Sequence, residues 1–193
     1  MNGYYSRDEL LRLGFESVGE DVQISEKACF YGAGNMRIGN HVRIDDFCIF
    51  IGDITLEDYI HIAGYVGLHA SRGSITIKSF STLSSRVAVY AASDDYSGAY
   101  MTNSVVPKEL THTIFSDIVI GKHVVVGTGS TLLPGAILPD GVAIGAMSLA
   151  KTKLDPWTIY AGIPCKKIKE RTKKLLRFVG GNSLLESREE TYP

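Results

Sequence analysis

The stretch from Ile120 to Ile144, IGKHVVVGTGSTLLPGAILPDGVAI, decides the fold of this 193-residue chain. An aliphatic residue stands at every sixth position of it: Ile120, Val126, Leu132, Leu138 and Ile144. Four residues after each of the first four comes a small or β-branched residue: Val124, Ser130, Ala136 and Val142. A period of six fits neither a helix nor simple strand alternation. It fits short strands joined by tight corners, each with one large and one small side chain pointing inward, which is a hexapeptide β-solenoid.

The same period extends over most of the chain. It appears in three further runs, which start at Val18, at Ile38 and at Ile77. A sandwich of short strands is the alternative, but it would show turn signals every 8–12 residues and gives no reason for strict sixes. We therefore predict an all-β fold, a parallel β-helix in which three hexapeptides make one triangular turn.

Three interruptions break the period, and all fall at the same corner of the predicted triangle. The gaps Phe30–Ile38, Leu68–Ile77 and Val89–Ile120 are eight, nine and thirty-one residues instead of six. With the faces numbered from Ile38, each gap lies between the third and the first face. Insertions on one edge of a solenoid usually build its working surface, although tolerated drift is the alternative. The largest is an inserted loop at about residues 90–119.

The ends of the chain are predicted to be caps. Ser6-Arg7-Asp8-Glu9 has the form of a capping box and precedes Leu10 and Leu11, which predicts a short helix within residues 1–17. After Pro164, the spacing of Ile168, Leu175 and Leu176 predicts a basic amphipathic helix that folds back on the last coil. The expected organisation is a helical cap at 1–17, a β-helix at 18–164, and a C-terminal helix and loose tail at 165–193.

Composition limits the kinds of partner. Lys and Arg number 20 and Asp and Glu number 21, a balance that argues against a nucleic-acid polymer or an anionic membrane as the partner. Residues 165–178, however, hold seven basic residues and one acidic residue, which favours a small polyanionic ligand. No apolar run approaches the roughly 18 residues of a membrane span, and the first residues lack the apolar core of a signal peptide. Three cysteines without paired spacing predict reduced thiols, a cytoplasmic protein and no metal knuckle.

Several motifs then resemble the hexapeptide-repeat acyltransferases. They are Ile120-Gly121-Lys122-His123-Val124-Val125-Val126-Gly127, Leu133-Pro134-Gly135-Ala136, Ile144-Gly145-Ala146-Met147-Ser148 and Ala161-Gly162-Ile163-Pro164-Cys165-Lys166. The resemblance covers about residues 18–175. It implies a left-handed β-helix, a homotrimer and acetyl-CoA as the acyl donor.

Within that family, the loop is similar to enzymes of bacterial surface-polysaccharide synthesis. The residues that carry this likeness are Ser93-Asp94-Asp95-Tyr96-Ser97-Gly98 and Tyr100-Met101-Thr102-Asn103. That branch, which serves lipopolysaccharide and O-antigen, includes acyltransferases acting on nucleotide-linked amino sugars such as dTDP-4-amino-4,6-dideoxyglucose. It also includes sugar O-acetyltransferases, so an amine and a hydroxyl acceptor both stay open.

Acyl transfer from a thioester needs a donor pocket, a nucleophile, a proton acceptor and oxyanion donors. The resemblance implies that Gly127, Gly145 and Ala146 let a pantetheine arm lie against the coil. It also implies that Lys151 and Lys166 meet the phosphates of CoA. The alternative is that these glycines only form corners and these lysines only solvate a face.

The proton acceptor departs from the galactoside-type enzymes, which place a catalytic histidine near the position of residues 93–95. This chain has Asp94 in that region and no histidine. Asp94 is therefore the first candidate, either as a base or as a group that binds the ammonium of an amino sugar. Because an amine needs less help from a base than a hydroxyl does, this favours N-acylation. A solvated loop tip is the alternative.

The remaining candidates are histidines and loop residues. His61 and His69 are the catalytic candidates among the histidines. The resemblance implies that a histidine directly before an inward aliphatic residue, as His61 stands before Ile62, contacts the thioester, and His69 borders the loop. His41 and His123 are expected to face solvent, and the sequence does not place His112. Side chains of the loop are expected to bind the sugar or its nucleotide: Asp95, Tyr96, Ser97, Tyr100 and Asn103. In a trimer, this loop would reach the coil of a neighbouring subunit.

Two other classes of function compete with the enzyme reading. A metal-dependent carbonic anhydrase of solenoid shape needs three convergent histidines, and the separations among His41, His61 and His69 do not repeat its pattern. A non-catalytic binding solenoid would retain no CoA. Of these readings, the acetyl-CoA-dependent sugar acyltransferase explains most features of the sequence.

Overall fold

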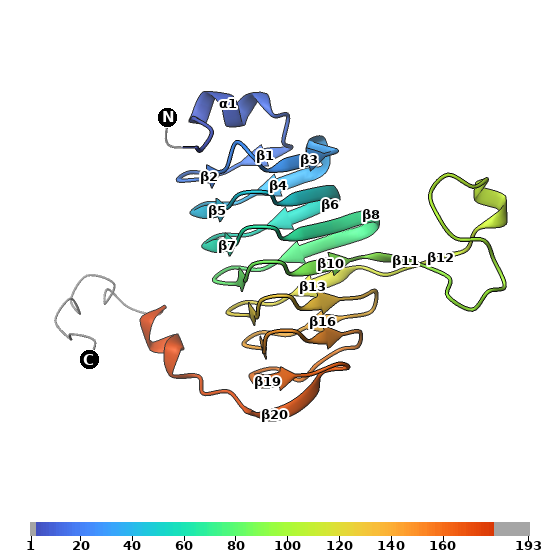
Figure 1. The fold of residues 1–193 in the computed structure, drawn as a ribbon. Helices are drawn as coiled ribbons and strands as arrows, with labels where there is room; N and C mark the ends of the chain where they lie inside the picture. The colour runs from blue at the N-terminus through green and yellow to red at the C-terminus, as the bar shows by residue number, and fades with distance from the viewer. Residues whose placement is uncertain (1–2, 180–193) are drawn as a thin grey trace.

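Each six-residue repeat forms a short strand that buries its large aliphatic residue, as the period predicts. The computed structural model describes residues 3–179, which coil into a column of stacked triangular turns (Figure 1). Ile44, Phe50, Ile120 and Leu132 are 0% exposed and belong to one continuous core. The core runs the length of the column because every coil buries the same positions as the next.

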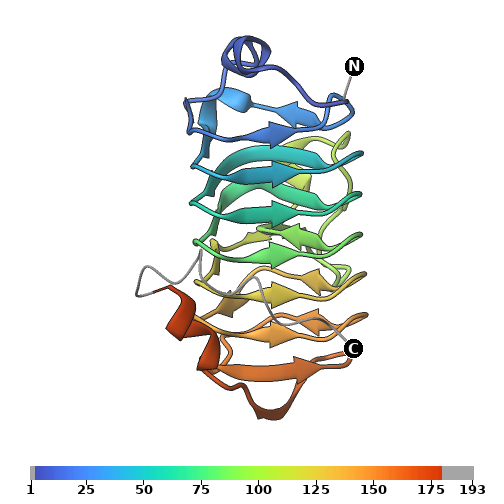
Figure 2. The same cartoon turned by 90° about the vertical axis from the view of Figure 1, so that its left-hand side faces the viewer.

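The second face is an eight-stranded sheet, and it faces the viewer in Figure 2. Its strands follow the order β2 (Gln23–Ile24), β5 (Val42–Ile44), β7 (Ile60–Ile62), β9 (Thr82–Leu83), β14 (Val125–Val126), β17 (Ala143–Ile144), β19 (Thr158–Ala161) and β20 (Lys166–Glu170). All neighbours pair in parallel except β19 and β20, which are antiparallel.

The first and third faces merge into a ten-stranded sheet because two long strands bend around the corner between them. The strands along its path are β1 (Ser17–Val18), β4 (Met36–Ile38), β6 (Ile49–Leu56), β8 (Gly67–Ile77), β10 (Ala88–Tyr90), β15 (Thr131–Leu132) and β18 (Leu149–Ala150). Three more strands join it from the side: β3 (Cys29–Tyr31), β13 (Ile118–Ile120) and β16 (Ile137–Leu138).

The strand register confirms the predicted frame of faces. Leu68 pairs with Val89 on the third face, and Ile77 pairs with Ile120 on the first face. Each pair lies across an interruption of the period. The inserted residues therefore leave the coil without shifting the register of the strands.

All three insertions emerge at the third corner, as predicted. The first contains a short 3₁₀ turn, η1 (Ala33–Asn35), and the second is the bend of β8 near Arg72. The third is the long loop, which leaves as β11 (Ala92–Asp94), passes η2 (Lys108–Leu110) and returns as β12 (Thr113–Phe115) antiparallel to β11. It projects away from the column in Figure 1.

At the first corner, aromatic side chains stack into a row that we call the aromatic ladder: His41, Tyr59, Phe80, His123 and Trp157. Each of these residues has a positive φ between 51° and 63°, a conformation that costs energy for residues other than glycine. Ring centroids in the first three steps lie 4.5, 4.9 and 5.1 Å apart. The coil spacing matches the distance that stacking requires, and the stacking offsets part of the backbone strain.

The N-terminal end of the column is covered by helix α1 (Arg7–Arg12). Ser6 and Glu9 form the capping box expected from the sequence, with both reciprocal hydrogen bonds present. Leu10 of this helix is 1% exposed, because it packs on the core at the first coil.

The prediction of a basic amphipathic helix after Pro164 is wrong. Residues Lys166–Glu170 instead form the exposed strand β20, and only a short 3₁₀ turn, η3 (Lys174–Phe178), follows. The last coil offers unpaired backbone groups, and pairing with β20 satisfies them where a helix would not. The lysines of β20 also oppose further strand addition at this edge. The tail predicted at 180–193 lies outside the described residues.

Arg171 attaches the segment after β20 to the first corner. Its backbone N–H donates to the carbonyl of Trp157 at 2.7 Å, and its guanidinium donates to the carbonyl of His123 at 2.7 Å. Lys173 then lies 5.7 Å from the ring centroid of Trp157. The basic segment is thereby held beside the last coils.

Candidate active site

The long loop and the bend of β8 enclose a cleft of about 700 Å³ at the third corner, here called the loop cleft. Ser71 and Arg72 line it from β8, while Asp94, Tyr96 and Asn103 line it from the loop. Asp94 accepts a hydrogen bond from the backbone N–H of Asn103 at 3.4 Å. The structure thus brings together three residues that the sequence singled out.

The other candidate loop residues shape the loop. Asp95 accepts hydrogen bonds from the backbone N–H of Ser97 at 2.8 Å and from its hydroxyl at 2.7 Å. These two bonds, the backbone one first, hold the pKa of Asp95 below its ordinary value. Tyr100 stacks on His112 with ring centroids 5.1 Å apart, which places the histidine that the sequence left unassigned.

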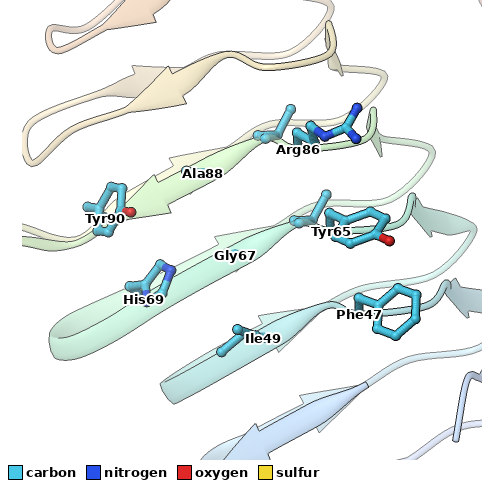
Figure 3. A pocket seen from close by; sticks show the side chains of 10 residues that line it. Phe47, Ile49, Tyr65, Gly67, His69, Arg86, Ala88 and Tyr90 are labelled. Atoms are coloured by element: carbon cyan, nitrogen blue, oxygen red, sulfur yellow. The ribbon is translucent and has the colours of Figure 1, made fainter. Parts of the chain in front are cut away.

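A second, smaller pocket of about 280 Å³ lies on the third face, and we call it the face pocket (Figure 3). His69 lines it and stacks on Tyr90 with ring centroids 4.7 Å apart. Burial lowers the pKa of His69, which keeps its imidazole neutral at pH 7. Tyr90 lines both pockets, so the face pocket that holds His69 and the loop cleft that holds Asp94 share one residue.

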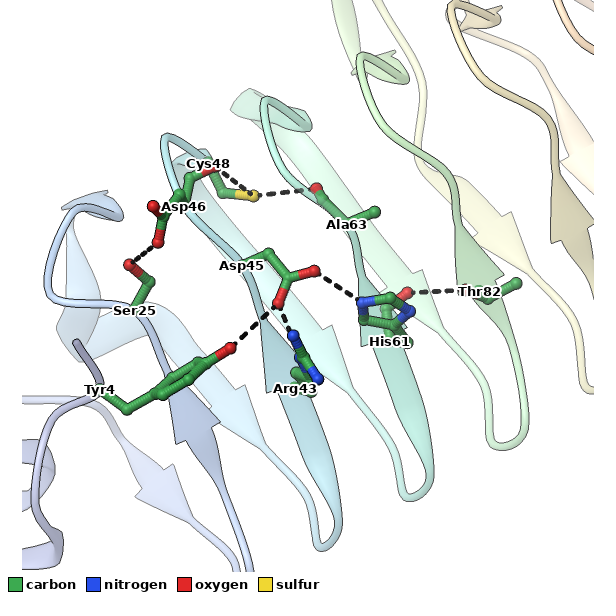
Figure 4. Close-up of polar contacts among 9 residues, drawn as sticks. All are labelled: Tyr4, Ser25, Arg43, Asp45, Asp46, Cys48, His61, Ala63 and Thr82. Atoms are coloured by element: carbon green, nitrogen blue, oxygen red, sulfur yellow. Dashed lines mark hydrogen bonds and ion pairs between the residues drawn. The ribbon is translucent and has the colours of Figure 1, made fainter. Parts of the chain in front are cut away.

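His61 lies on the second face and lines neither pocket. Its Nε2 is 2.8 Å from Oδ2 of Asp45, and the Nε of Arg43 donates to Oδ1 of Asp45 at 2.7 Å (Figure 4). Burial by itself would raise the pKa of Asp45, but the hydrogen bonds and charges of His61 and Arg43 outweigh it and lower that pKa. The structure therefore separates His61 from Asp94 within one chain.

Small residues form a row along the edge of the second face, the small-residue row: Ala63, Ser84, Gly127, Gly145 and Ala161. The backbone N–H groups of the first four members donate to the next coil. Each bonds to the carbonyl of the residue just before the next member of the row, as Gly127 does to Ile144 at 2.8 Å. Beyond Ala161 the row meets Lys166, which pairs with Ala161 in β20. An extended chain could therefore lie flat along the coil axis and end at a lysine.

The structure constrains the two glycines of the row to different degrees. A Cβ on Gly127 would stand 2.5 Å from the backbone N of Ala146, so the stacking of coils requires glycine there. For a Cβ on Gly145 the nearest atom would be the Cβ of Ala161 at 3.0 Å, and the nearest backbone atom, the carbonyl oxygen of Tyr160, would stand at 3.5 Å. Coil packing thus explains Gly127 without a ligand, while Ala146 stands exposed beside the row.

Lys151 and Lys166 lie on different corners. Lys151 follows β18, whose Ala150 pairs with Leu132, so it belongs to the third corner. Lys166 stands at the end of the small-residue row near the second corner. The third face of the triangle therefore separates the two lysines.

Ser84 is a member of the row that the sequence reasoning missed. The signal was present, because Ser84 follows the inward Leu83 as Gly127 follows Val126, and Leu83 pairs with Val126. Its side chain is half-buried on the outer surface of the second face.

Within residues 3–179, no three His, Cys, Asp or Glu side chains converge to hold a metal ion. In the same residues, no helix has both the length and the apolar character needed to cross a membrane.

Known proteins resemble this chain over most of its length, although no protein-family model matches it. The dTDP-4-amino-4,6-dideoxy-D-glucose acyltransferase of Escherichia coli is 49% identical over 176 residues, which are 90% of this chain and 91% of the relative. A putative lipopolysaccharide biosynthesis O-acetyl transferase, WbbJ of Escherichia coli K12, is 32% identical over 70% of this chain and 69% of its own.

Solved structures of AntD, an N-acyltransferase from Bacillus cereus, are also similar. One variant, in complex with dTDP-4-amino-4,6-dideoxyglucose and coenzyme A, has a TM-score of 0.91 at 42% identity and covers 93% of this chain and 96% of AntD. Another AntD structure contains dTDP and 3-hydroxybutyryl-CoA. The AntD variants include changes at a serine and at an aspartate ten positions further along.

The Asp45 ion pairs predict a dependence of stability on pH. Because the pKa of Asp45 is lowered in the folded chain, its charge stabilises the fold above the unfolded pKa of about 3.9, and this contribution is lost as the pH falls through the folded pKa. We expect Asp45→Asn to lower the free energy of unfolding at pH 7 by about 1 kcal/mol. The difference should shrink as the pH falls through the folded pKa of Asp45, which lies below that unfolded value.

Urea unfolding at fixed protein concentration between about pH 2 and pH 7, a range that extends well below the unfolded pKa of an aspartate, measures this difference. Glu109→Gln is the control, because Glu109 is exposed and makes no recorded ion pair within residues 3–179. A difference between Asp45→Asn and the parent that stays constant over the whole range would contradict the prediction.

Proposed function

This chain belongs to the left-handed β-helix, hexapeptide-repeat family of sugar acyltransferases, and from that premise we propose that it transfers an acetyl group from acetyl-CoA to the amine of a nucleotide-linked amino sugar. The observation that carries the proposal is the similarity, over nine tenths of the chain, to an acyltransferase of dTDP-4-amino-4,6-dideoxy-D-glucose. We assign the same sugar class as acceptor.

Asp94 is the residue we assign to the acceptor amine. It lines the loop cleft beside Tyr96 and Asn103. An ammonium must lose a proton before its nitrogen attacks the thioester, and a carboxylate can bind the ammonium and accept that proton. The new C–N bond forms as the C–S bond breaks, and the CoA thiolate leaves with a proton from the site or from solvent.

The spacing of the AntD variants supports this assignment. Those variants change a serine and an aspartate ten positions apart, and this chain carries Ser84 and Asp94 at the same separation. Ser84 lies in the small-residue row and Asp94 in the loop cleft. We therefore place the thioester near Ser84.

The small-residue row is the place we propose for the pantetheine arm of CoA. From Ala161 to Ala63 the row takes four coil steps, or about 19 Å. The backbone N–H groups of Ala63, Ser84, Gly127 and Gly145 are donated to the next coil, so the two amides of pantetheine would donate to carbonyl oxygens along the row. Lys166 and the basic segment after it lie at the end where the phosphates would be, near Gly145 and Ala146.

The site is incomplete within one chain. The small-residue row lies on the second face, whereas Asp94, His69 and Lys151 lie beside or beyond the third. We propose a homotrimer in which the row of one subunit meets the loop of the next. His69 would then border the acceptor, and His61 would lie near the acyl group.

A cytoplasmic role in bacterial surface-polysaccharide synthesis fits these assignments. Cys29, Cys48 and Cys165 are free thiols, as expected in a reducing compartment. Burial raises the pKa of Cys48 to about 11, so that thiol is inert.

Sugar O-acetylation is the second candidate, because the chain is 32% identical to a putative O-acetyl transferase. A hydroxyl acceptor would need a stronger base than an amine does. His69, kept neutral by burial, is the group available for that role beside Tyr90.

A panel of acceptors distinguishes these candidates. We expect free thiol to be released from acetyl-CoA with dTDP-4-amino sugars and not with their 4-hydroxyl counterparts, because an unprotonated amine attacks a thioester without strong base assistance. Thiol release is followed with a colorimetric reagent, and the acetylated sugar is identified by mass. If thiol were released only with the hydroxyl acceptors, the proposal of N-acylation would be wrong and O-acetylation would take its place.

Replacement of Asp94 tests its role in proton transfer. Asp94→Asn should lower kcat by about a hundredfold or more, the usual contribution of a general base, and leave the Kd for CoA within about twofold. Glu109→Gln, in the same loop, is the matched control and should keep its rate. Unchanged turnover in Asp94→Asn would remove Asp94 from the reaction.

Mixed oligomers test the proposal that two chains build each site. Asp94→Asn disables the loop, and Ser84→Trp blocks the small-residue row. If both parts came from different subunits of a trimer, co-refolding equal amounts of the two variants should restore about one quarter of the sites, because one ordered pairing in four joins two intact parts. No recovery above either variant alone would show that each site is built by one chain.

A further inference from the structure

The small-residue row ends at its N-terminal side in charged side chains. Asp45 occupies the position in its coil that Ala63 and Ser84 occupy in the next two, and its backbone N–H donates to the carbonyl of Ile62 at 2.9 Å. Arg43 and His61 pair with each other in adjacent strands beside that row. We call Arg43, Asp45 and His61 the polar wall.

The polar wall is held in place by its own contacts. Both carboxylate oxygens of Asp45 are engaged, one by His61 at 2.8 Å and the other by Arg43 at 2.7 Å (Figure 4). Tyr4 adds a third contact, because its hydroxyl lies 3.5 Å from Oδ1 of Asp45. The Tyr4 ring centroid is also 5.7 Å from the Cζ of Arg43. The side chain of Asp45 retains 22% exposure, so the wall is ordered and still reaches the surface.

The Nδ1 of His61 is a polar atom of the wall that is left for a ligand, besides the terminal guanidinium nitrogens of Arg43. The Nε2 of His61 is engaged by Asp45, and its Nδ1 has no hydrogen-bond partner among residues 3–179. The His61 side chain is 46% exposed. With Nε2 facing a carboxylate, the imidazole is fixed in orientation, and Nδ1 is free to bond to an oxygen-bearing group.

We propose that the polar wall selects the acyl group: acetyl fits in front of it, and a longer chain is accepted when it carries a hydroxyl that bonds to His61. The inference rests on the proposed function, which places the thioester near Ser84. From there a two-carbon group ends beside Ser84, whereas a third and fourth carbon point over Ala63 toward the wall. His61 is thus a specificity-determining residue.

The physical basis is the cost of removing water from the wall. An unsubstituted four-carbon chain would cover the Nδ1 of His61 without replacing its hydrogen bond to water. A hydroxyl on the third carbon would restore that bond. Sites built to hydrogen-bond a substrate group reject the analogue that lacks it, and we expect at least tenfold discrimination in kcat/KM here.

The test compares acetyl-CoA, butyryl-CoA and 3-hydroxybutyryl-CoA with the amino-sugar acceptor. In the parent protein we expect kcat/KM to favour 3-hydroxybutyryl over butyryl by about tenfold. His61→Leu should bring this ratio close to one, because leucine forms a hydrogen bond with neither acyl group. His61→Gln, which keeps a polar terminus, should restore most of the ratio.

His41→Leu is the matched control. His41 also pairs with an aspartate, its Nδ1 lying 2.9 Å from Oδ2 of Asp21, and its side chain is 42% exposed. It stands in the aromatic ladder at the first corner, away from the small-residue row. The ratio should therefore stay at the parent value in His41→Leu.

Calorimetric binding of the three thioesters without any acceptor gives a second readout. It should show the same order of affinities and the same loss of preference in His61→Leu. If acetyl transfer proceeds but the ratio is equal in the parent and His61→Leu, the selection by the wall is refuted and the proposed function stands. If no thioester binds or reacts, the proposed function fails and this inference fails with it.

Discussion

The stacking of each six-residue strand on its equivalent in the next coil is the constraint on which the rest of this structure depends. Backbone hydrogen bonds join the coils in register, as where Ile44 pairs with Ile62. Because equivalent positions repeat at the strand spacing of about 4.8 Å, outward side chains fall into rows along the axis just as inward ones do. The aromatic ladder, the small-residue row and the polar wall are all consequences of this repetition.

The same constraint decides where additional chain can leave the column. A strand that is paired above and below tolerates no insertion, whereas a corner does. The chain uses one corner for all three insertions, and the loop that carries Asp94 grows from it. The small-residue row, which we propose for the pantetheine arm, lies along another edge of the triangle. A rigid column keeps these two parts separate, which is the physical reason for assigning them to different subunits.

Much of this arrangement could be predicted, because the period of the inward residues sets the register of the strands. The pairing of Leu68 with Val89 across a bend follows from counting in sixes, and so does the corner from which the loop with Asp94 emerges. The C-terminal segment was mispredicted, because the spacing of its apolar residues is compatible with a helix. The unpaired edge of the last coil draws it into a strand instead.

The sequence by itself determined the β-helix, its frame of faces and the corner from which the loop emerges, since those depend on a periodic pattern that is legible residue by residue. Only the tertiary structure decided which outward side chains meet. It paired His61 with Asp45 and put Lys151 and Lys166 on different corners. Such contacts depend on the geometry of stacked coils and of the chain's free edges, and no local spacing encodes them.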